Sequence, residues 1–244
     1  MNYIQLNDHS RFDDEEWEVA NKLGFQNVTP FYKKHLMQRK LKIQKGDFIM
    51  GEIPVMLSAM KQLGIDYHYN DYPESLQKYL HRKVWTSTMK EVRQRLYDDL
   101  DGELELGLGW FIKPKDKLKR FTGFVCSIID DLQYVNGAGN QTKLWCSEPV
   151  IFVSEYRCPV INGKVMGMYA APGKDGKLPD RIIVEQMAKD FVDAPSAYAL
   201  DVGVLHTGET ALIEVNDGFS LGRYGIPADV YTQLLQTRWS ELCS

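Results

Sequence analysis

Two apolar segments near the C-terminus constrain this chain more than any other feature. Residues 198–203 (YALDVG) and 211–218 (ALIEVNDG) place acidic or amide groups among β-forming residues, and the short polar turn between them predicts a hairpin. Side chains alternate along a strand, so Glu214 and Asn216 should share one face, with Asp201 on the neighbouring strand. These three oxygen donors suit a hard divalent cation such as Mg²⁺, although a solvated strand edge is the commoner origin of such a pattern.

A second apolar segment ends in a lysine. Residues 110–112 lead to Lys113 and then to a proline that ends the strand. A lysine at the end of a buried strand is costly to desolvate unless it meets an anion. Residues 115–120 add four more cations, which form either an exposed hairpin loop or a cradle for polyphosphate, with Gly123 allowing close approach of the backbone. In the cradle interpretation, this loop is a lid that becomes ordered over phosphate.

A third segment pairs an acid with an arginine. Glu155 and Arg157 should lie on one strand face, and the dipeptide Asn162-Gly163 predicts a hairpin directly afterwards. The pair is either a cross-strand ion pair of small energetic value or an arginine that binds a phosphate or carboxylate through two parallel hydrogen bonds. Spacing alone does not decide between them.

The order of these segments resembles the catalytic core of ATP-grasp ligases. A lysine strand, a basic loop, a helix, a Ser-Glu connection, a Glu-x-Arg strand, a helix, an Asp strand and a Glu-x-Asn strand follow one another over roughly residues 85–225. The chain is most similar to a small phage and bacterial branch of predicted amide ligases. The resemblance implies an α+β fold in which two α/β subdomains hold a nucleotide between antiparallel sheets.

The resemblance also implies a role for each matching residue. The metal ligands are Asp201, Glu214 and Asn216, and the cofactors are ATP and Mg²⁺. Arg157 and Lys115 are assigned to catalysis. The residues that it assigns to nucleotide binding are Lys90, Lys113, Lys115, Ser147, Glu148, Val150 and Glu155.

Three positions depart from the usual family pattern. The phosphate loop is rich in lysine and has a single glycine, which favours contact through side chains. Lys90 is the best candidate for a second nucleotide lysine, and a solvated helix lysine is an equal alternative. The arginine expected after the Glu-x-Arg hairpin is missing, and Lys174, in a turn-forming Gly-Lys-Asp-Gly sequence, is the candidate substitute.

The N-terminal third is less regular. Residues 47–51, 53–63 and 66–69 predict a strand, a helix and a strand, with Gly64 ending the helix. This region resembles a shortened form of the small α/β domain that precedes the ATP-grasp core. We therefore expect an N-terminal domain of residues 1–84 and a catalytic core of residues 85–244.

Composition constrains the chemistry further. The net charge of −4 argues against general nucleic-acid binding, and the sequence has no apolar span of membrane length, which favours the cytoplasm. The four cysteines show no metal-binding spacing and are expected to be reduced and buried. Whether the chain forms a homodimer stays open.

The resemblance implies an ATP- and Mg²⁺-dependent ligase. It would join a carboxylate of a small molecule or peptide to an amine through an acylphosphate. Two alternatives remain: a phosphotransferase on the same fold, and a nucleotide-binding module without turnover. The glycine-rich segment 218–225, with Arg223, either lines the acceptor side or is only a turn before the last helix.

Overall fold

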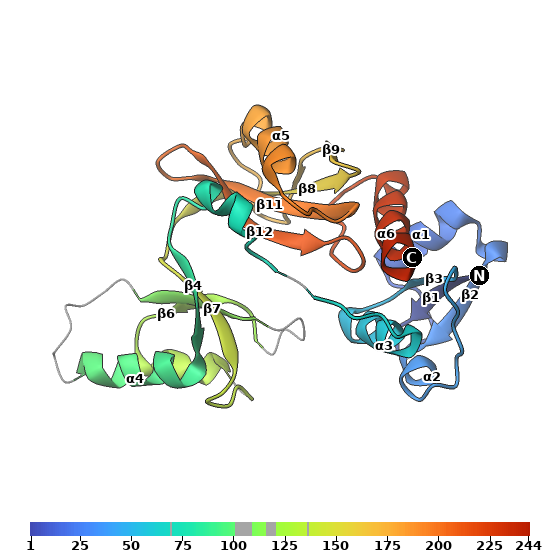
Figure 1. The fold of residues 1–244 in the computed structure, drawn as a ribbon, viewed down its shortest axis with the longest axis horizontal. Helices are drawn as coiled ribbons and strands as arrows, with labels where there is room; N and C mark the ends of the chain where they lie inside the picture. The colour runs from blue at the N-terminus through green and yellow to red at the C-terminus, as the bar shows by residue number, and fades with distance from the viewer. Residues whose placement is uncertain (69, 101–108, 116–120, 136) are drawn as a thin grey trace. The chain divides into compact units, whose positions relative to one another are not determined.

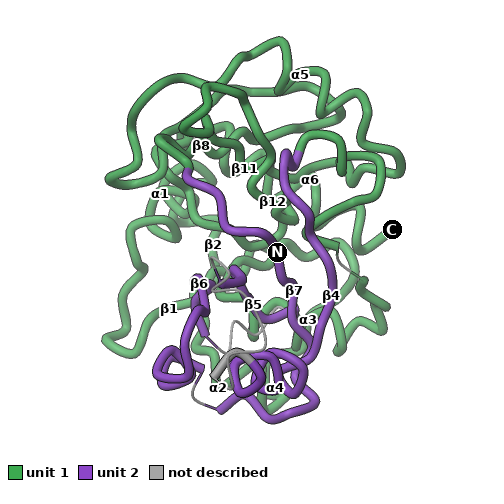
Figure 2. The backbone as a smooth tube through the Cα atoms, turned by 90° about the vertical axis from the view of Figure 1, so that its left-hand side faces the viewer, with its two compact units in different colours: residues 1–79, 152–244 green, residues 80–151 purple. Residues whose placement is uncertain are grey.

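A computed structural model describes residues 1–68, 70–100, 109–115, 121–135 and 137–244. The chain forms two compact units, drawn in different colours in Figure 2. Unit 1 comprises Met1–Tyr79 and Phe152–Ser244, and unit 2 comprises Leu80–Ile151. Each unit is described by itself.

The first half of unit 1 is built on a small parallel sheet. Its strands β1 (Asn2–Leu6), β2 (Val28–Tyr32) and β3 (Phe48–Met50) are ordered β2-β1-β3. The predicted helix after β3 is confirmed, and its C-terminal residue Gly64 adopts the left-handed conformation (φ 72°) that glycine tolerates. The helices of this half are α1 (Asp14–Leu23), α2 (Lys33–Met37) and α3 (Ile53–Leu63), with short 3₁₀ helices η1 (Phe25–Asn27) and η2 (Glu74–Tyr79).

The strand predicted at residues 66–69 is wrong for the described residues 66–68, which belong to no sheet. Side chains hold this segment instead. The ring of Tyr67 packs edge-on against Phe219 with centroids 5.2 Å apart, and its hydroxyl donates to Asp217 at 3.0 Å. Alternation of polar and aromatic residues therefore arises here from side-chain anchoring, without a backbone ladder.

The second half of unit 1 is an antiparallel sheet of order β10-β8-β11-β12, with β9 paired to β8 (Figure 1). Both predicted hairpins are confirmed: β11 pairs with β12, and Asn162 and Gly163, both with positive φ, turn β8 into β9. The elements are β8 (Phe152–Ile161), β9 (Lys164–Val165), β10 (Tyr169–Ala170), α5 (Arg181–Asp190), β11 (Ala197–Leu205), β12 (Thr210–Asp217) and α6 (Ala228–Cys243).

The two halves of unit 1 share one core. Phe219, Tyr231 and Trp239, from the segment after β12 and from α6, are buried with Ile4 and Ile49 of the parallel sheet. The Trp239 indole also donates to the carbonyl of Asp47 at 2.7 Å. These contacts explain why the compact units do not follow the expected domains, residues 1–84 and 85–244. That division, as a boundary of the catalytic core in the sequence, stays a prediction.

Unit 2 is a four-stranded antiparallel sheet with helix α4 against it (Figure 1). Its strand order is β4-β7-β5-β6, and Pro114 ends β5 as predicted. Ile112, Leu144 and Cys146 point into the core with Met89 and Val92 of α4. The elements are β4 (Val84–Thr88), α4 (Met89–Leu100), β5 (Trp110–Pro114), β6 (Phe124–Cys126), η3 (Ile129–Val135) and β7 (Lys143–Ser147).

The four cysteines are buried and free, as expected. Burial raises the pKa of Cys126 to about 11 and that of Cys146 to about 12, so both are thiols at neutral pH. Within the described ranges, no helix is both long and apolar enough to cross a membrane.

Candidate functional site

A buried arginine–aspartate pair lies at the centre of the antiparallel sheet of unit 1. Arg157 on β8 is opposite Asp201 on β11, and the two side chains are 5% and 2% exposed. The guanidinium donates two parallel hydrogen bonds, from Nε to Oδ1 at 2.9 Å and from Nη2 to Oδ2 at 2.7 Å. Burial alone would lower the pKa of Arg157, but the hydrogen bonds and charge of Asp201 raise it, so the side chain remains a cation.

The predicted metal ligands meet beside this pair. Asp201 is paired in register with Glu214, and Ala199 with Asn216, so the three polar side chains share one face of the hairpin. The Asn216 amide donates from Nδ2 to Asp201 Oδ2 at 2.8 Å and to Glu214 Oε1 at 3.1 Å. The sequence thus placed these residues correctly relative to one another, while their role as ligands stays a prediction.

A loop after β12 encloses the arginine from another direction. Arg157 Nη1 donates to the carbonyl of Gly222 at 2.7 Å. The ring of Tyr224 lies over the guanidinium, with its centroid 4.0 Å from the guanidinium carbon. Tyr224 has a φ of 50°, a conformation unusual for a residue other than glycine. The loop therefore holds the plane of the arginine in one orientation.

Glu155 adds a third carboxylate to this face. Burial raises its pKa, and the charges of Asp201 and Glu214 raise it further, while Arg157 and Lys174 lower it. The backbone of Glu155 donates to the carbonyl of Lys174 at 3.1 Å, so the proposed substitute for the missing arginine lies next to the predicted ribose residue. We call Glu155, Arg157, Asp201, Glu214 and Asn216 the carboxylate cluster.

The chemistry of the carboxylate cluster fits a divalent cation. Three carboxylates face one guanidinium, and this excess of negative charge raises the pKa of Glu155. Asp201 is already occupied by Arg157, so Glu214 and Asn216 have the greater capacity for a new ligand. No group of three His, Cys, Asp or Glu side chains in the described ranges is arranged to hold a metal. A cation here would therefore need the Asn216 amide oxygen, substrate phosphate oxygens and water to complete its shell.

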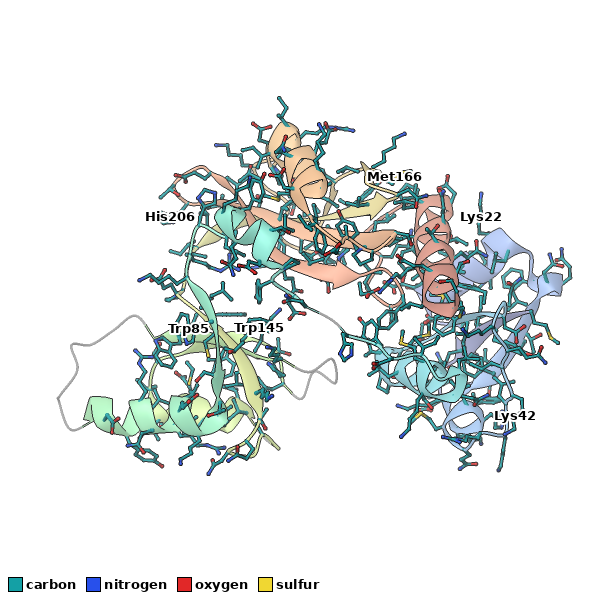
Figure 3. All side chains as sticks on the ribbon, viewed as in Figure 1. Lys22, Lys42, Trp85, Trp145, Met166 and His206 are labelled. Carbon is teal, nitrogen blue, oxygen red and sulfur yellow. The ribbon has the colours of Figure 1, made fainter. Side chains whose placement is uncertain are left out.

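Unit 2 presents the predicted nucleotide lysines on one sheet face. Lys113 on β5 is opposite Trp145 on β7, and Lys115 Nζ lies 4.4 Å from the centre of the Trp145 ring. Figure 3 labels Trp145 on this sheet. A side chain added at Gly123 would meet the Phe111 ring at 2.6 Å, so this glycine allows close packing against β5. The remaining cations of the predicted cradle, at 117, 119 and 120, lie outside the described residues, as does most of the proposed lid.

The residues predicted to hold the adenine follow directly on this face. Ser147 ends β7, is 3% exposed and donates from Oγ to the carbonyl of Glu148 at 3.1 Å. Glu148 is exposed, and its carboxylate accepts from the backbone of Lys83 at 2.9 Å. Val150 is half-buried and lies beyond the strand. Lys90, at the second position of α4, is exposed, which leaves both of its interpretations open.

Sequence reasoning missed Trp145, Gly222 and Tyr224. The strand alternation that places Ser147 on the lysine face also places Trp145 there, so this residue could have been found. Nothing in the spacing pairs Tyr224 with Arg157, because their contact joins residues far apart in the chain.

The sequence profile of a family described as an ATP-grasp domain, the second family of its clade, matches residues 79–234. The chain belongs to this ATP-grasp family. The match includes the lysine strand, the Glu-x-Arg strand and the Glu-x-Asn strand. No curated protein matches the chain.

Solved structures show the same ATP-grasp fold at low sequence identity. The chain is similar to a RimK-domain ATP-grasp protein of Sphaerobacter thermophilus, at 12% identity and a TM-score of 0.56, with 98% of this chain and 99% of that chain covered. It is similar to D-alanine–D-alanine ligase of Bacillus anthracis complexed with ATP, at 17% identity and a TM-score of 0.53, covering 97% and 94%. It is also similar to a macrocyclase of Microcystis aeruginosa bound with its precursor peptide, at 12% and 0.50, covering 97% and 99%. The predicted α+β ATP-grasp fold is confirmed.

Proposed function

We propose that this ATP-grasp protein is an ATP- and Mg²⁺-dependent ligase that joins a carboxylate to an amine. The observation that carries this proposal is the carboxylate cluster, in which Glu214 and Asn216 flank the Arg157–Asp201 pair. A purely structural ion pair would not need two further polar side chains on the same face. Membership of the ATP-grasp family makes ATP the expected nucleotide.

Each unit carries groups that the proposed reaction needs. Lys113 and Lys115 supply cations for the phosphates, and the Trp145 ring limits where the Lys115 ammonium group lies. Glu214 and Asn216 would hold Mg²⁺, which when bound neutralises phosphate charge. Arg157, fixed by Asp201, Gly222 and Tyr224, is a preorganised donor for the transferred phosphoryl group or for the substrate carboxylate.

The proposed reaction has two steps. A substrate carboxylate oxygen attacks the γ-phosphorus of ATP, the bond to the bridging oxygen breaks, and ADP leaves as an acylphosphate forms. The amine nitrogen then attacks the acyl carbon, inorganic phosphate leaves, and the amine loses a proton. Arg157 and the lysines bind the phosphate oxygens during the first step, where fixed cations lower the barrier more than mobile ones.

The substrates are expected to be small molecules or peptides. A structural neighbour is bound with a precursor peptide and another is a ligase of D-alanine, and these facts belong to those proteins. A peptide acceptor and a free amino acid both remain within the proposal, since fold similarity does not determine a substrate.

The test is incubation with ATP, Mg²⁺ and pooled amino acids and peptides, followed by mass spectrometry for a condensation product and an assay for ADP. Ligase activity predicts an amide product with stoichiometric ADP. A phosphorylated acceptor without an amide would support the phosphotransferase alternative. ATP binding without ADP formation under any substrate pool would support a non-catalytic module. Glu214→Gln and Lys113→Ala should abolish the product, and Lys164→Ala, at an exposed hairpin position, is the matched control.

A further inference from the structure

A second polar cavity lies on the opposite face of the β11–β12 hairpin. Val215 and Asp217 alternate with Glu214 and Asn216 along β12, so they point away from the carboxylate cluster. Both line a cavity of about 550 Å³ that lies wholly within unit 1, and its walls include the segment before η2 and the loop after α5. No role proposed above uses this cavity.

A buried tyrosine in the cavity wall has an unused hydroxyl group. Tyr198 is 0% exposed, and its hydroxyl has no hydrogen-bond partner among the residues that the structure describes. Leaving a buried hydroxyl unpaired costs free energy comparable to a lost hydrogen bond. Since Tyr198 lines a cavity, a bound molecule can supply the missing partner.

The charges that line the cavity favour a cation. Glu74, Asp193 and Asp217 carry three negative charges against the single positive charge of Arg238. Arg238 already donates to Asp217 at 2.7 and 2.9 Å and to Glu241 at 2.6 Å, so little of its charge remains for an anionic ligand. The rim residue His68 is exposed and lies 3.3 Å from Asp66, which offsets any charge that it gains.

The apolar part of the wall favours a flat body on the ligand. Phe191 and Tyr198 form an edge-to-face pair with centroids 5.1 Å apart, and both line the cavity. Aromatic faces attract cations as well as apolar groups. An amidinium or ammonium group on a small aromatic or apolar body would therefore meet carboxylates, rings and the Tyr198 hydroxyl together.

We propose that this cavity is a binding site for a small organic cation, separate from the carboxylate cluster. The probes are benzamidine, benzamide and benzoate, which share a shape and carry a positive, zero and negative charge. Saturation-transfer NMR and titration should show benzamidine binding most tightly and benzoate not at all. The Tyr198→Phe substitution keeps the ring and removes the hydroxyl, so it should weaken benzamidine binding about fivefold without lowering the melting temperature.

Two matched substitutions separate this site from the carboxylate cluster, which is also acidic. Glu74→Gln should weaken benzamidine binding about threefold. Glu214→Gln, the same change on the opposite face, should leave it unaltered. The proposal is overturned if benzoate binds as well as benzamidine, if no probe binds, or if Glu214→Gln alone weakens binding while Glu74→Gln and Tyr198→Phe do not.

Discussion

The two buried arginine–aspartate pairs of unit 1 have the same chemistry and different surroundings. Arg157 and Arg238 each donate two parallel hydrogen bonds to one carboxylate, Asp201 and Asp217 respectively. Side chains from other elements complete the second pair: Glu241 accepts from Arg238, and the Tyr67 hydroxyl donates to Asp217. A backbone carbonyl, an aromatic ring and an amide shared with another carboxylate complete the first pair.

This difference shows that a buried bidentate pair does not by itself mark an active site. Arg238 joins α6 to the end of β12, and its neighbours satisfy it from within the protein. Arg157 lies among Glu155 and Glu214, whose negative charge it only partly balances. The surplus of negative charge around the first pair, more than the pair itself, indicates a site for a cation and a phosphate.

The largest expected effect is on turnover. Arg157→Lys keeps the charge but cannot reproduce the two parallel hydrogen bonds, so we expect kcat for ADP formation to fall about 10²- to 10³-fold. Arg238→Lys should leave kcat per folded molecule unchanged, because this arginine faces away from the carboxylate cluster. Steady-state kinetics with the folded fraction measured by circular dichroism tests the contrast, and equal losses in both variants would remove the distinction between the pairs.

The next effect is on stability. Arg238→Met leaves Asp217 buried without its partner, which should lower the free energy of unfolding by about 3–5 kcal/mol. Arg157→Met should show a similar loss without divalent cations and a smaller one with Mg²⁺, because the ion can replace the missing charge beside Asp201 and Glu214. Urea denaturation with and without Mg²⁺ measures both.

A Mg²⁺ rescue of Arg238→Met as large as that of Arg157→Met would contradict the assignment of the cation to the carboxylate cluster. The double variant Arg238→Met/Asp217→Leu is the control for the first effect. It removes the unpaired carboxylate and should recover part of the lost stability.

The sequence predicted the carboxylate cluster better than its surroundings. Strand alternation is a local property, so Asp201, Glu214 and Asn216 could be placed together from spacing alone. Tyr224 and Gly222 could not, because their contacts with Arg157 depend on how a loop returns over the sheet. The strand expected at 66–69 was wrong for the same reason: Tyr67 is anchored to a residue 150 positions away. Polar character hid strands β1 and β2 and helix α1, although buried Val19 and Ala20 lie on one side of that helix.

A smaller effect concerns pH. Because burial and neighbouring carboxylates raise the pKa of Glu155 above its ordinary value of 4.5, the folded protein binds a proton more tightly than the unfolded chain. Stability from this group is therefore present below pH 4.5 and is lost as the pH rises through the folded pKa. Glu16, whose pKa burial raises to about 7, gives a slope of the same sign, so the measurement belongs in a Glu16→Gln background.

In that background, Glu155→Gln should flatten the remaining dependence of unfolding free energy on pH, and Mg²⁺ should flatten it in the unsubstituted cluster. Denaturation curves at a series of pH values measure the slope. An unchanged slope in Glu155→Gln would show that the negative charge of the cluster is already balanced, as it is around Arg238.

The smallest expected effect comes from the ring above Arg157. Tyr224 contributes a cation–π contact, and such contacts are worth about 0.5–2 kcal/mol. Asp201 and the Gly222 carbonyl also restrain the guanidinium, so Tyr224→Leu should lower kcat only about 2- to 30-fold. Tyr224→Phe keeps the ring and should keep kcat. Leucine and phenylalanine both carry a β-carbon at the left-handed φ of 50°, so backbone strain is matched between the two variants. If both lowered kcat equally, the tyrosine hydroxyl or the loop would be responsible, and Arg157 would be held, like Arg238, by its polar partners alone.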